Sequence, residues 1–390
     1  GARLEERLGV RLLRRTTRTM TLTDAGEAFY ARARAALAAV RDAERSVRRS
    51  DDAVTIATTS GRAMPGIEVR ALGLRRGQVS LAPLFTMRRW LREWRPDVLE
   101  TWMYHADLIG GLAARLAGHR HVVWNVRQTG LDGADIGPAT RAVVRLCGAL
   151  SGWLPARIVC NAQAAIAAHA ALGYAADRFT VLPNGFDTGM FTRQAAAGQA
   201  LRREWGVADE QLLVGMVARL DPQKDHANFI AAAQIVAAAL PAARFVLAGR
   251  GIPDDPALGR LIAQAGLSQQ VLRLGQRSDV AALMSTLDLF CLSSRAEGFP
   301  NVLGEAMACE TPAVSTDAGD ARALLGDDAL VAPIQDAPAL AACVLRVASL
   351  APAQRRALGL QQRLRIVAEY DIHRVWARYR ALYTDVLQQA

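Results

Sequence analysis

The chain has 390 residues, of which 51% are hydrophobic and 22% charged, so it can bury large cores and is expected to hold two or three domains. Its longest apolar runs, such as residues 229–240, are shorter than the ~20 residues that span a bilayer, and its first residues lack the order of a signal peptide. Five scattered cysteines without a Cys-x-x-Cys pair and six histidines without metal-ligand spacing argue against a disulfide or zinc framework. These features predict a cytoplasmic protein without a transmembrane helix.

Residues 1–50 carry most of the formal net charge of +10, because twelve arginines there face six acidic residues. They show no strand pattern, and the second of two helical patterns predicts a long helix over residues 23–47. Residues 3–47 resemble the second half of a LysR-type winged helix-turn-helix, with the end of a recognition helix, a wing and the start of a dimerisation helix. The resemblance implies weak DNA binding through phosphate contacts, which position a protein without specifying a sequence, made by Arg14, Arg15 and Arg18. The alternative is a solvated basic helical appendage.

A first α/β domain is predicted over residues 52–187, from short apolar runs separated by helical patterns. Its expected strands lie near 54–58, 68–72, 97–100, 121–126, 156–160 and 179–182. Residues 182–187 contain Pro183 and Asn184-Gly185, which is strong turn chemistry, and are expected to connect this domain to the next one across a cleft.

A second α/β domain is predicted over residues 188–372, followed by a C-terminal helix over 373–390. Its expected strands lie near 213–218, 245–248, 271–274, 288–292, 312–315 and 329–332, and its expected helices near 224–239, 256–266, 300–309 and 336–348. Alternation of strands and helices is typical of a parallel sheet covered by helices. The fold class is therefore α/β with two Rossmann-like domains, preceded by a helical fragment.

The segment from Leu292 to Met307 predicts an anion site. A strand ends, a Gly-Phe-Pro turn follows, and a helix begins near Pro300 or Asn301, so its free backbone N–H groups face the carboxyl edge of the sheet. Glu305 falls one turn inside this helix, where its carboxylate can accept hydrogen bonds from a ribose diol, and Glu297 on the loop can reach a second polyol.

Lys224 is the only lysine of the chain, and it follows Arg219 by five positions. Arg219 is expected at the end of a strand and Lys224 at the start of the next helix, opposite Glu305, where a cation opposes the helix dipole unless an anion is bound. These two cations and the helix end suffice to hold a diphosphate, and no Asp-x-Asp pair is present to hold a metal ion. A third loop at that edge contains Gly249 and Gly251, which are expected to let the backbone approach a ligand.

Together with Asn184-Gly185-Phe-Asp187 and Tyr370-Asp-Ile, these motifs resemble glycosyltransferase family 4, whose members are retaining, metal-independent enzymes of the GT-B fold. The resemblance covers residues 52–390 and implies a nucleotide-sugar donor, no cofactor, and a glycan or lipid-linked acceptor in surface polysaccharide assembly. It implies catalytic roles for Arg219, Lys224 and Glu297. It also implies donor contacts from Gly249, Gly251, Gly298, Phe299, Pro300, Asn301, Val302, Leu303 and Glu305.

The first α/β domain also resembles the acceptor domain of that family, and Tyr104, His105 and Arg127 are candidates for its acceptor side. His105 can equally cap the next helix, and Gln128, which stands where related enzymes often carry a histidine, cannot act as a general base. The family's first strand and its glycine-rich loop are not visible, so the domain reads as truncated. A non-catalytic nucleotide-sugar binder and a DNA-binding regulator therefore stay open beside the transferase, and peripheral membrane contact at the inner face through a basic surface is a further expectation.

Overall fold

The structure is a computed structural model that describes residues 13–15, 20–22, 55–58, 68–72, 82–128 and 137–389. The chain divides into two compact units, Gly1–Thr86 and Met87–Ala390. In the first unit, β1 (Leu13–Arg15) and β2 (Met20–Leu22) form an antiparallel pair, which corrects the expectation that residues 1–50 contain no strand. Arg14 and Arg15 lie in β1, whereas Arg18 and the helix expected over 23–47 lie outside the described residues.

Four parallel strands form the first sheet of the second unit, in the order β5 (Leu99–Trp102), β6 (Val122–Val126), β7 (Arg157–Cys160) and β8 (Phe179–Val181). The two earlier predicted strands, β3 (Thr55–Thr58) and β4 (Glu68–Ala71), pair in parallel with each other in a separate sheet. Among the described residues, the six strands predicted for the first domain therefore fall into two separate sheets, one in each unit.

Helices precede or connect the strands of this four-stranded sheet. They are α3 (Ala82–Trp94), α4 (Tyr104–Ala117), α5 (Pro138–Leu150), α6 (Ala164–Ala170) and the 3₁₀ turn η1 (Ala176–Arg178). All five residues of β6 are buried, as a central parallel strand requires.

The second sheet has six parallel strands in the order β11-β10-β9-β12-β13-β14. Its strands are β9 (Leu213–Val217), β10 (Arg244–Ala248), β11 (Val271–Leu274), β12 (Leu289–Leu292), β13 (Ala313–Thr316) and β14 (Val331–Ala332). Each lies within two residues of its prediction, because every strand is a short apolar run bounded by turn residues. The prediction of α/β architecture with parallel sheets is confirmed.

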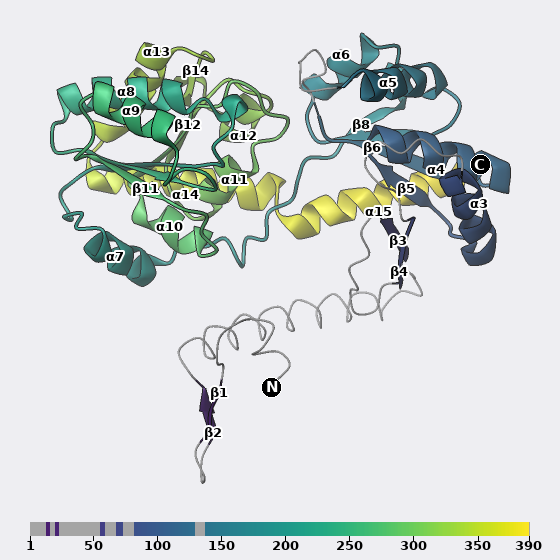
Figure 1. Cartoon of the computed structure of the whole chain (residues 1–390), viewed down its shortest axis with the longest axis horizontal. Coiled ribbons are helices and arrows are strands. Elements are labelled where there is room, and N and C mark those ends of the chain that lie inside the picture. The colour runs from purple at the N-terminus through teal and green to yellow at the C-terminus, as the bar shows by residue number, and fades with distance from the viewer. Residues whose placement is uncertain are drawn as a thin grey trace. The chain divides into compact units, whose positions relative to one another are not determined.

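Helices cover both faces of the six-stranded sheet, with α8, α9 and α13 on one side and α7, α10 and α14 on the other (Figure 1). The predicted helices are α8 (His226–Ala239), α9 (Pro256–Gln264), α11 (Asn301–Ala308) and α13 (Ala337–Ala348). Four further helices were not predicted: α7 (Ala195–Glu204), α10 (Val280–Thr286), α12 (Ala321–Leu325) and α14 (Pro352–Glu369). Two 3₁₀ turns complete the domain, η2 (Pro222–Lys224) and η3 (Asp328–Leu330).

The C-terminal helix α15 (Ile372–Gln388) packs on the four-stranded sheet rather than forming a separate segment. Its Leu382 and Val386 share a buried cluster with Val123 and Val159 of β6 and β7. The connection at 182–187 runs beside the start of this helix, since the Phe186 N–H donates to the Tyr370 carbonyl at 2.8 Å and the Ile372 N–H donates to the Phe186 carbonyl at 2.9 Å. A long-range pairing therefore ties the turn to a segment almost two hundred positions away in the sequence.

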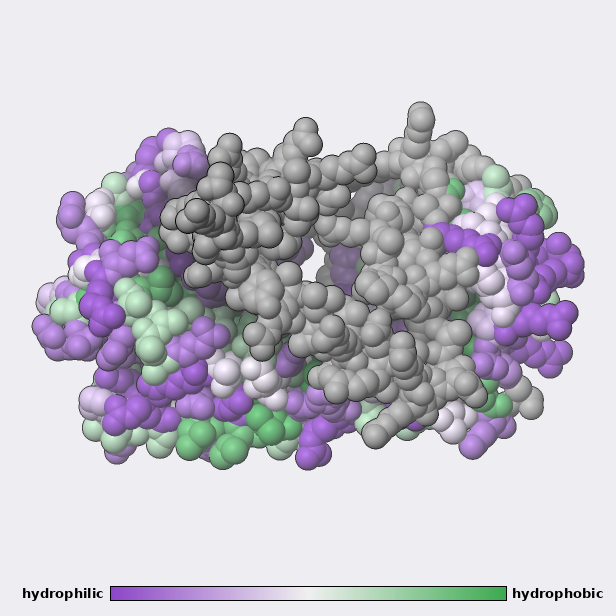
Figure 2. Space-filling model, turned by 90° about the horizontal axis from the view of Figure 1, so that it is seen from below, coloured by the Kyte–Doolittle hydropathy of each residue, from purple (hydrophilic) through white to green (hydrophobic). Residues whose placement is uncertain are grey.

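The surface carries scattered apolar side chains on a mainly hydrophilic background, as the described residues in Figure 2 show. Within the described part of the chain, no single helix is both long and apolar enough to cross a membrane. Helices α13 and α14 pass that test only when joined, and they are bent by 112° at their break.

Candidate functional site

Lys224 lies on the 3₁₀ turn η2 and not on the first turn of the following helix, which corrects the sequence prediction. Helix α8 begins two residues later, and its N-cap is Asp225, whose side chain accepts from the Asn228 N–H. A carboxylate at this position favours the helix dipole. The start of α8 is therefore capped by Asp225, and Lys224 precedes the helix.

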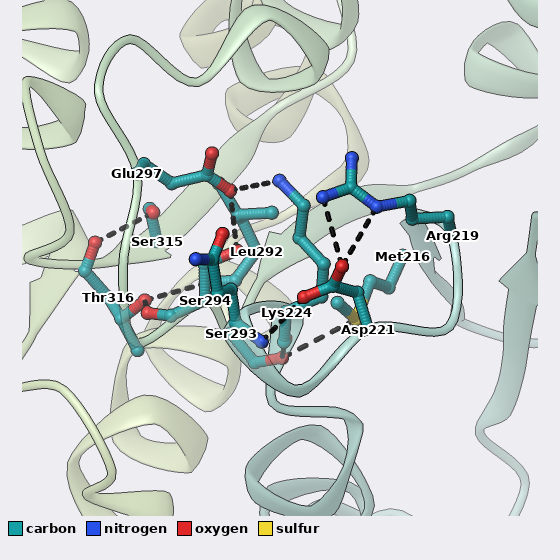
Figure 3. Close-up of polar contacts among 11 residues, drawn as sticks. Met216, Arg219, Asp221, Lys224, Leu292, Ser293, Ser294, Glu297, Ser315 and Thr316 are labelled. Carbon is teal, nitrogen blue, oxygen red and sulfur yellow. Dashed lines mark hydrogen bonds and ion pairs between the residues drawn. The ribbon is translucent and has the colours of Figure 1, made fainter. Parts of the chain in front are cut away.

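Glu297 is the partner of Lys224 (Figure 3), whereas the sequence analysis expected Lys224 to face Glu305. Lys224 Nζ lies 2.5 Å from Glu297 Oε1, and the Ser294 hydroxyl donates to the same oxygen at 2.7 Å. The side chains of Lys224 and Glu297 are only 16% and 11% exposed. Charges as buried as these are stable only when paired, so each fixes the position of the other.

Arg219 forms a second ion pair, with Asp221, which the sequence analysis did not select. Arg219 Nε and Nη2 both lie 3.0 Å from Asp221 Oδ2, and Asp221 Oδ1 accepts from the Gln223 N–H at 2.9 Å (Figure 3). The Gln223 N–H, helped by Arg219, lowers the pKa of the Asp221 carboxyl below its ordinary value. The Asp-Pro pair before Gln223 was the signal for this N-cap.

Helix α11 starts at Asn301, as predicted, and its N-cap Pro300 provides no side-chain hydrogen bond to the first turn. Phe299 and Leu303 are buried in the core, and Phe299 packs against Phe186 and Tyr370. Their side chains are therefore structural, and the backbone N–H groups of this stretch are what it can offer to an anion.

Gly319 supports this loop and was missed by the sequence analysis. Its φ is +59°, and a Cβ there would lie 2.3 Å from the Gly298 carbonyl oxygen. Only glycine allows both the left-handed backbone and this close approach.

Gly249 and Gly251 also have positive φ, but the structure gives them a packing role. A Cβ on Gly249 would lie 2.0 Å from the Ala218 carbonyl oxygen, and one on Gly251 would lie 3.2 Å from Leu220 Cβ. These glycines let the segments that follow β9 and β10 pack against each other. This packing explains glycine at both positions without a contact to a ligand.

Glu305 lines a cavity of about 560 Å³. Burial raises the pKa of its carboxyl, which has no hydrogen-bond partner among the described residues. The cavity wall brings together Arg127 and Asn301, which were predicted for the acceptor and donor sides, with Trp102, Asn184 and Trp376, which were not predicted as site residues.

Arg127 connects several elements at this cavity. Its Nη1 donates to Asn184 Oδ1 at 2.6 Å, and its Nη2 donates to the Tyr379 hydroxyl of α15. Asn184 Nδ2 in turn donates to Asn301 Oδ1 at 2.7 Å. A chain of hydrogen bonds thus runs from α15 through the end of β6 and the 182–187 connection to the first residue of α11.

Two of the predicted acceptor-side candidates lie elsewhere. Tyr104 is buried, and its hydroxyl is 3.1 Å from His169 Nε2 in the core behind the four-stranded sheet. His105 is exposed on α4, whose N-cap is Met103, and it does not line the cavity. Neither residue lies at the ion pairs of Arg219 and Lys224. The first turn of α4 directs Tyr104 into the core and leaves His105 at the surface.

Parallel strands with cations and a helix N-terminus at their carboxyl ends form the kind of edge at which α/β proteins bind anionic ligands. Two family models match it: the model described as Glycosyltransferase Family 4 matches residues 38–189, and that described as Glycosyl transferases group 1 matches residues 211–349. The chain therefore carries glycosyltransferase family 4 and group 1 domains. The first match begins inside the segment for which a helix-turn-helix was expected, and neither match includes residues 1–37.

Curated relatives agree with these matches. The chain is 25% identical over 235 residues to the UDP-Gal:alpha-D-GlcNAc-diphosphoundecaprenol alpha-1,3-galactosyltransferase of Escherichia coli, covering 59% of this chain and 60% of that protein. It is 36% identical over 132 residues, 34% of either chain, to a Campylobacter jejuni 4-alpha-N-acetylgalactosaminyltransferase that acts on N-acetylgalactosamine-N,N'-diacetylbacillosaminyl-diphospho-undecaprenol. The chain thus spans about one third to three fifths of the length of these relatives.

Solved structures show the same fold. The crystal structure of Anabaena HepE in complex with UDP-glucose matches with a TM-score of 0.70 at 21% identity, covering 86% of this chain and 92% of that one. A sucrose-phosphate synthase from Thermosynechococcus elongatus matches with a TM-score of 0.69 at 19% identity, covering 84% of this chain and 86% of that one. The two parallel sheets therefore match structures of the GT-B type.

Proposed function

We propose that the chain is a retaining glycosyltransferase that moves a sugar from a nucleotide-sugar donor to a glycan or lipid-linked acceptor without a metal ion. The observation that carries this proposal is the Lys224–Glu297 ion pair at 2.5 Å beside the uncapped start of α11, with Glu305 one turn further along that helix. The family matches and the names of the E. coli and C. jejuni relatives, which describe diphospho-undecaprenol acceptors, support this class of substrate.

The proposed reaction breaks the bond between the anomeric carbon of the sugar and the donor diphosphate, and negative charge builds on the diphosphate. Lys224 and the α11 N–H groups stabilise that charge from fixed positions, which is the form of electrostatic catalysis that costs no reorganisation during the reaction. Arg219 is half exposed and leaves Asp221 to contribute a second cation. Glu305 accepts hydrogen bonds from the ribose diol.

Replacement of Lys224 tests the proposal directly. Removing one preorganised charge of this kind lowers turnover by about 10²–10³, so Lys224→Ala is expected to lose transfer of sugar from a panel of UDP-, GDP- and ADP-sugars while retaining its circular dichroism spectrum. Lys224→Arg is the matched control, because it keeps the charge but not the compact ammonium. Its turnover is expected to lie between those of the wild-type protein and Lys224→Ala.

Unchanged turnover in Lys224→Ala would reject the proposed clamp. The same assays in EDTA test metal independence, since transfer abolished by the chelator and restored by a divalent ion contradicts it. Donor binding without transfer to any acceptor would instead select a nucleotide-sugar binder.

We keep DNA binding by residues 3–47 as a separate proposal. The antiparallel β1–β2 pair is the element that the wing of a winged helix-turn-helix needs. Replacing Arg14, Arg15 and Arg18 by Ala is expected to abolish salt-sensitive binding to duplex DNA, and wild-type protein that shows no shift in a low-salt titration removes the idea.

A further inference from the structure

We propose that the cavity beside Glu305 binds the acceptor by stacking a pyranose ring on the indole rings of Trp102 and Trp376. This inference rests on the proposed function and narrows it, because it requires the acceptor to present a sugar ring at this site. Trp102 ends strand β5 and Trp376 lies on α15, and both line the cavity. Each is 52% exposed, which leaves large apolar ring area in contact with solvent at a concave site.

The polar groups on the wall behind these rings already have partners. Glu100 Oε1 accepts from Asn125 Nδ2 at 2.6 Å and Glu100 Oε2 accepts from the Tyr383 hydroxyl at 2.7 Å. The Arg127 guanidinium lies over the Trp102 ring, 4.6 Å from its centroid, and is itself held by Asn184 and Tyr379. The wall is therefore preorganised, and its exposed aromatic rings are the surface that a ligand meets.

The backbone next to Trp102 is strained. Met103 has φ 70° and ψ 155°, a conformation that costs about 1–3 kcal/mol in a residue other than glycine. It is held because the Met103 N–H donates to the Asn125 carbonyl at 2.9 Å and the Met103 carbonyl accepts from the Asp107 N–H at 3.0 Å. Such strain occurs where a chain is fixed for ligand binding, here at the carboxyl end of β5.

Polar side chains beside the rings decide between a sugar and a hydrocarbon chain. Asn301, Glu305 and Asn184 line the same cavity. Asn184 already bonds to Asn301 and Arg127, whereas the Glu305 carboxylate has no partner among the described residues. A carboxylate offers about four acceptor positions, so Glu305 can accept from a pyranose hydroxyl beside the two hydroxyls of the donor ribose, and a hydrocarbon chain would leave those positions without a hydrogen bond. The apolar C–H face of a pyranose can then pack on the indole rings. Because Glu305 lines this cavity and also belongs to the proposed donor site, the pyranose would lie next to the donor.

Saturation-transfer NMR on the full chain tests this proposal with soluble probes. The probes are the methyl pyranosides of glucose, galactose, mannose, N-acetylglucosamine and N-acetylgalactosamine, with decyl phosphate as the lipid-like alternative. At least one methyl pyranoside is expected to receive saturation on its ring protons. Trp102→Ala and Trp376→Ala are each expected to weaken that binding about two- to tenfold, and Trp376→Phe to retain most of it, because ring stacking contributes modestly per ring.

Trp153→Ala is the matched control. Trp153 is 55% exposed and also carries an arginine over its ring, Arg115 at 5.4 Å, but it does not line the cavity. Equal weakening in all three Ala variants, saturation confined to decyl phosphate, or no pyranoside signal at all would overturn the proposal. Thermal shifts with UDP, GDP and ADP separate the stacking site from the donor site. A nucleotide that raises the melting temperature while no pyranoside binds rejects only the stacking site. If no nucleotide shifts the melting temperature, the donor site is rejected.

Discussion

The two parallel sheets of the Met87–Ala390 unit use their carboxyl ends differently. At the ends of β9 and β12, charged residues meet in pairs, Lys224 with Glu297 and Arg219 with Asp221. At the end of β5, Tyr104 and Asp107 of α4 turn into the core, and the cavity wall is built from Trp102 and from side chains of other elements. The difference teaches that a position just after a strand does not by itself place a side chain in a site, because the packing of the following helix decides where that side chain points.

The largest effect that this comparison predicts is on the Lys224–Glu297 pair. Lys224→Met or Glu297→Gln alone leaves one mostly buried charge without its partner, which is expected to lower the free energy of unfolding by about 3–5 kcal/mol. The double variant is expected to recover a large part of that loss. Urea denaturation of the four proteins measures the coupling, and additive losses would show that the pair does not hold the loop in place.

Gly319 tests the geometry of the same loop. Gly319→Ala is expected to destabilise the chain by about 2–3 kcal/mol, because it adds a clash with the Gly298 carbonyl to the left-handed backbone cost. Gly266→Ala is the control, since Gly266 has φ +74° but a Cβ there meets nothing within 4 Å. Equal changes in melting temperature for the two variants would contradict a role for the close contact.

Asp107 tests the claim that the polar residues after β5 belong to the core. It is fully buried, and burial raises the pKa of its carboxyl to about 8, against the hydrogen bond that it accepts from the Thr101 hydroxyl at 2.6 Å. Because the folded state keeps a proton that the unfolded chain releases at about pH 4, stability is expected to fall as the pH rises from about 4 to 8. Asp107→Asn should flatten this part of the melting-temperature profile, and an unchanged slope would place the titration elsewhere.

His105 provides the smallest predicted effect. It is exposed, and it makes neither a cap for α4 nor a contact in the cavity. His105→Ala is expected to change the free energy of unfolding by less than about 0.5 kcal/mol and to leave transfer unaltered. A large loss of transfer would show that the end of β5 contributes a polar group to the site after all, and so would remove the contrast between the two sheets.

Local pattern was enough to locate most of the second sheet and the start of α11. Short apolar runs bounded by turns identify buried parallel strands, and Gly-Phe-Pro marks the helix start whatever lies around it. The same reasoning missed α14, whose apolar residues are spread among many polar ones, and it missed the β1–β2 pair, whose strands are only three residues each.

The sequence by itself determined the alternation of strands and helices and identified Arg219, Lys224 and Glu297 near the β9 and β12 edge, because these depend on neighbours within a few positions. Only the tertiary structure decided that Lys224 pairs with Glu297 and not with Glu305, that Tyr104 turns inward, and that Trp102 and Trp376 share one cavity. Those outcomes depend on how loops and helices from different parts of the chain pack against the strands. Packing of that kind joins residues far apart in the chain, and no local periodicity encodes it.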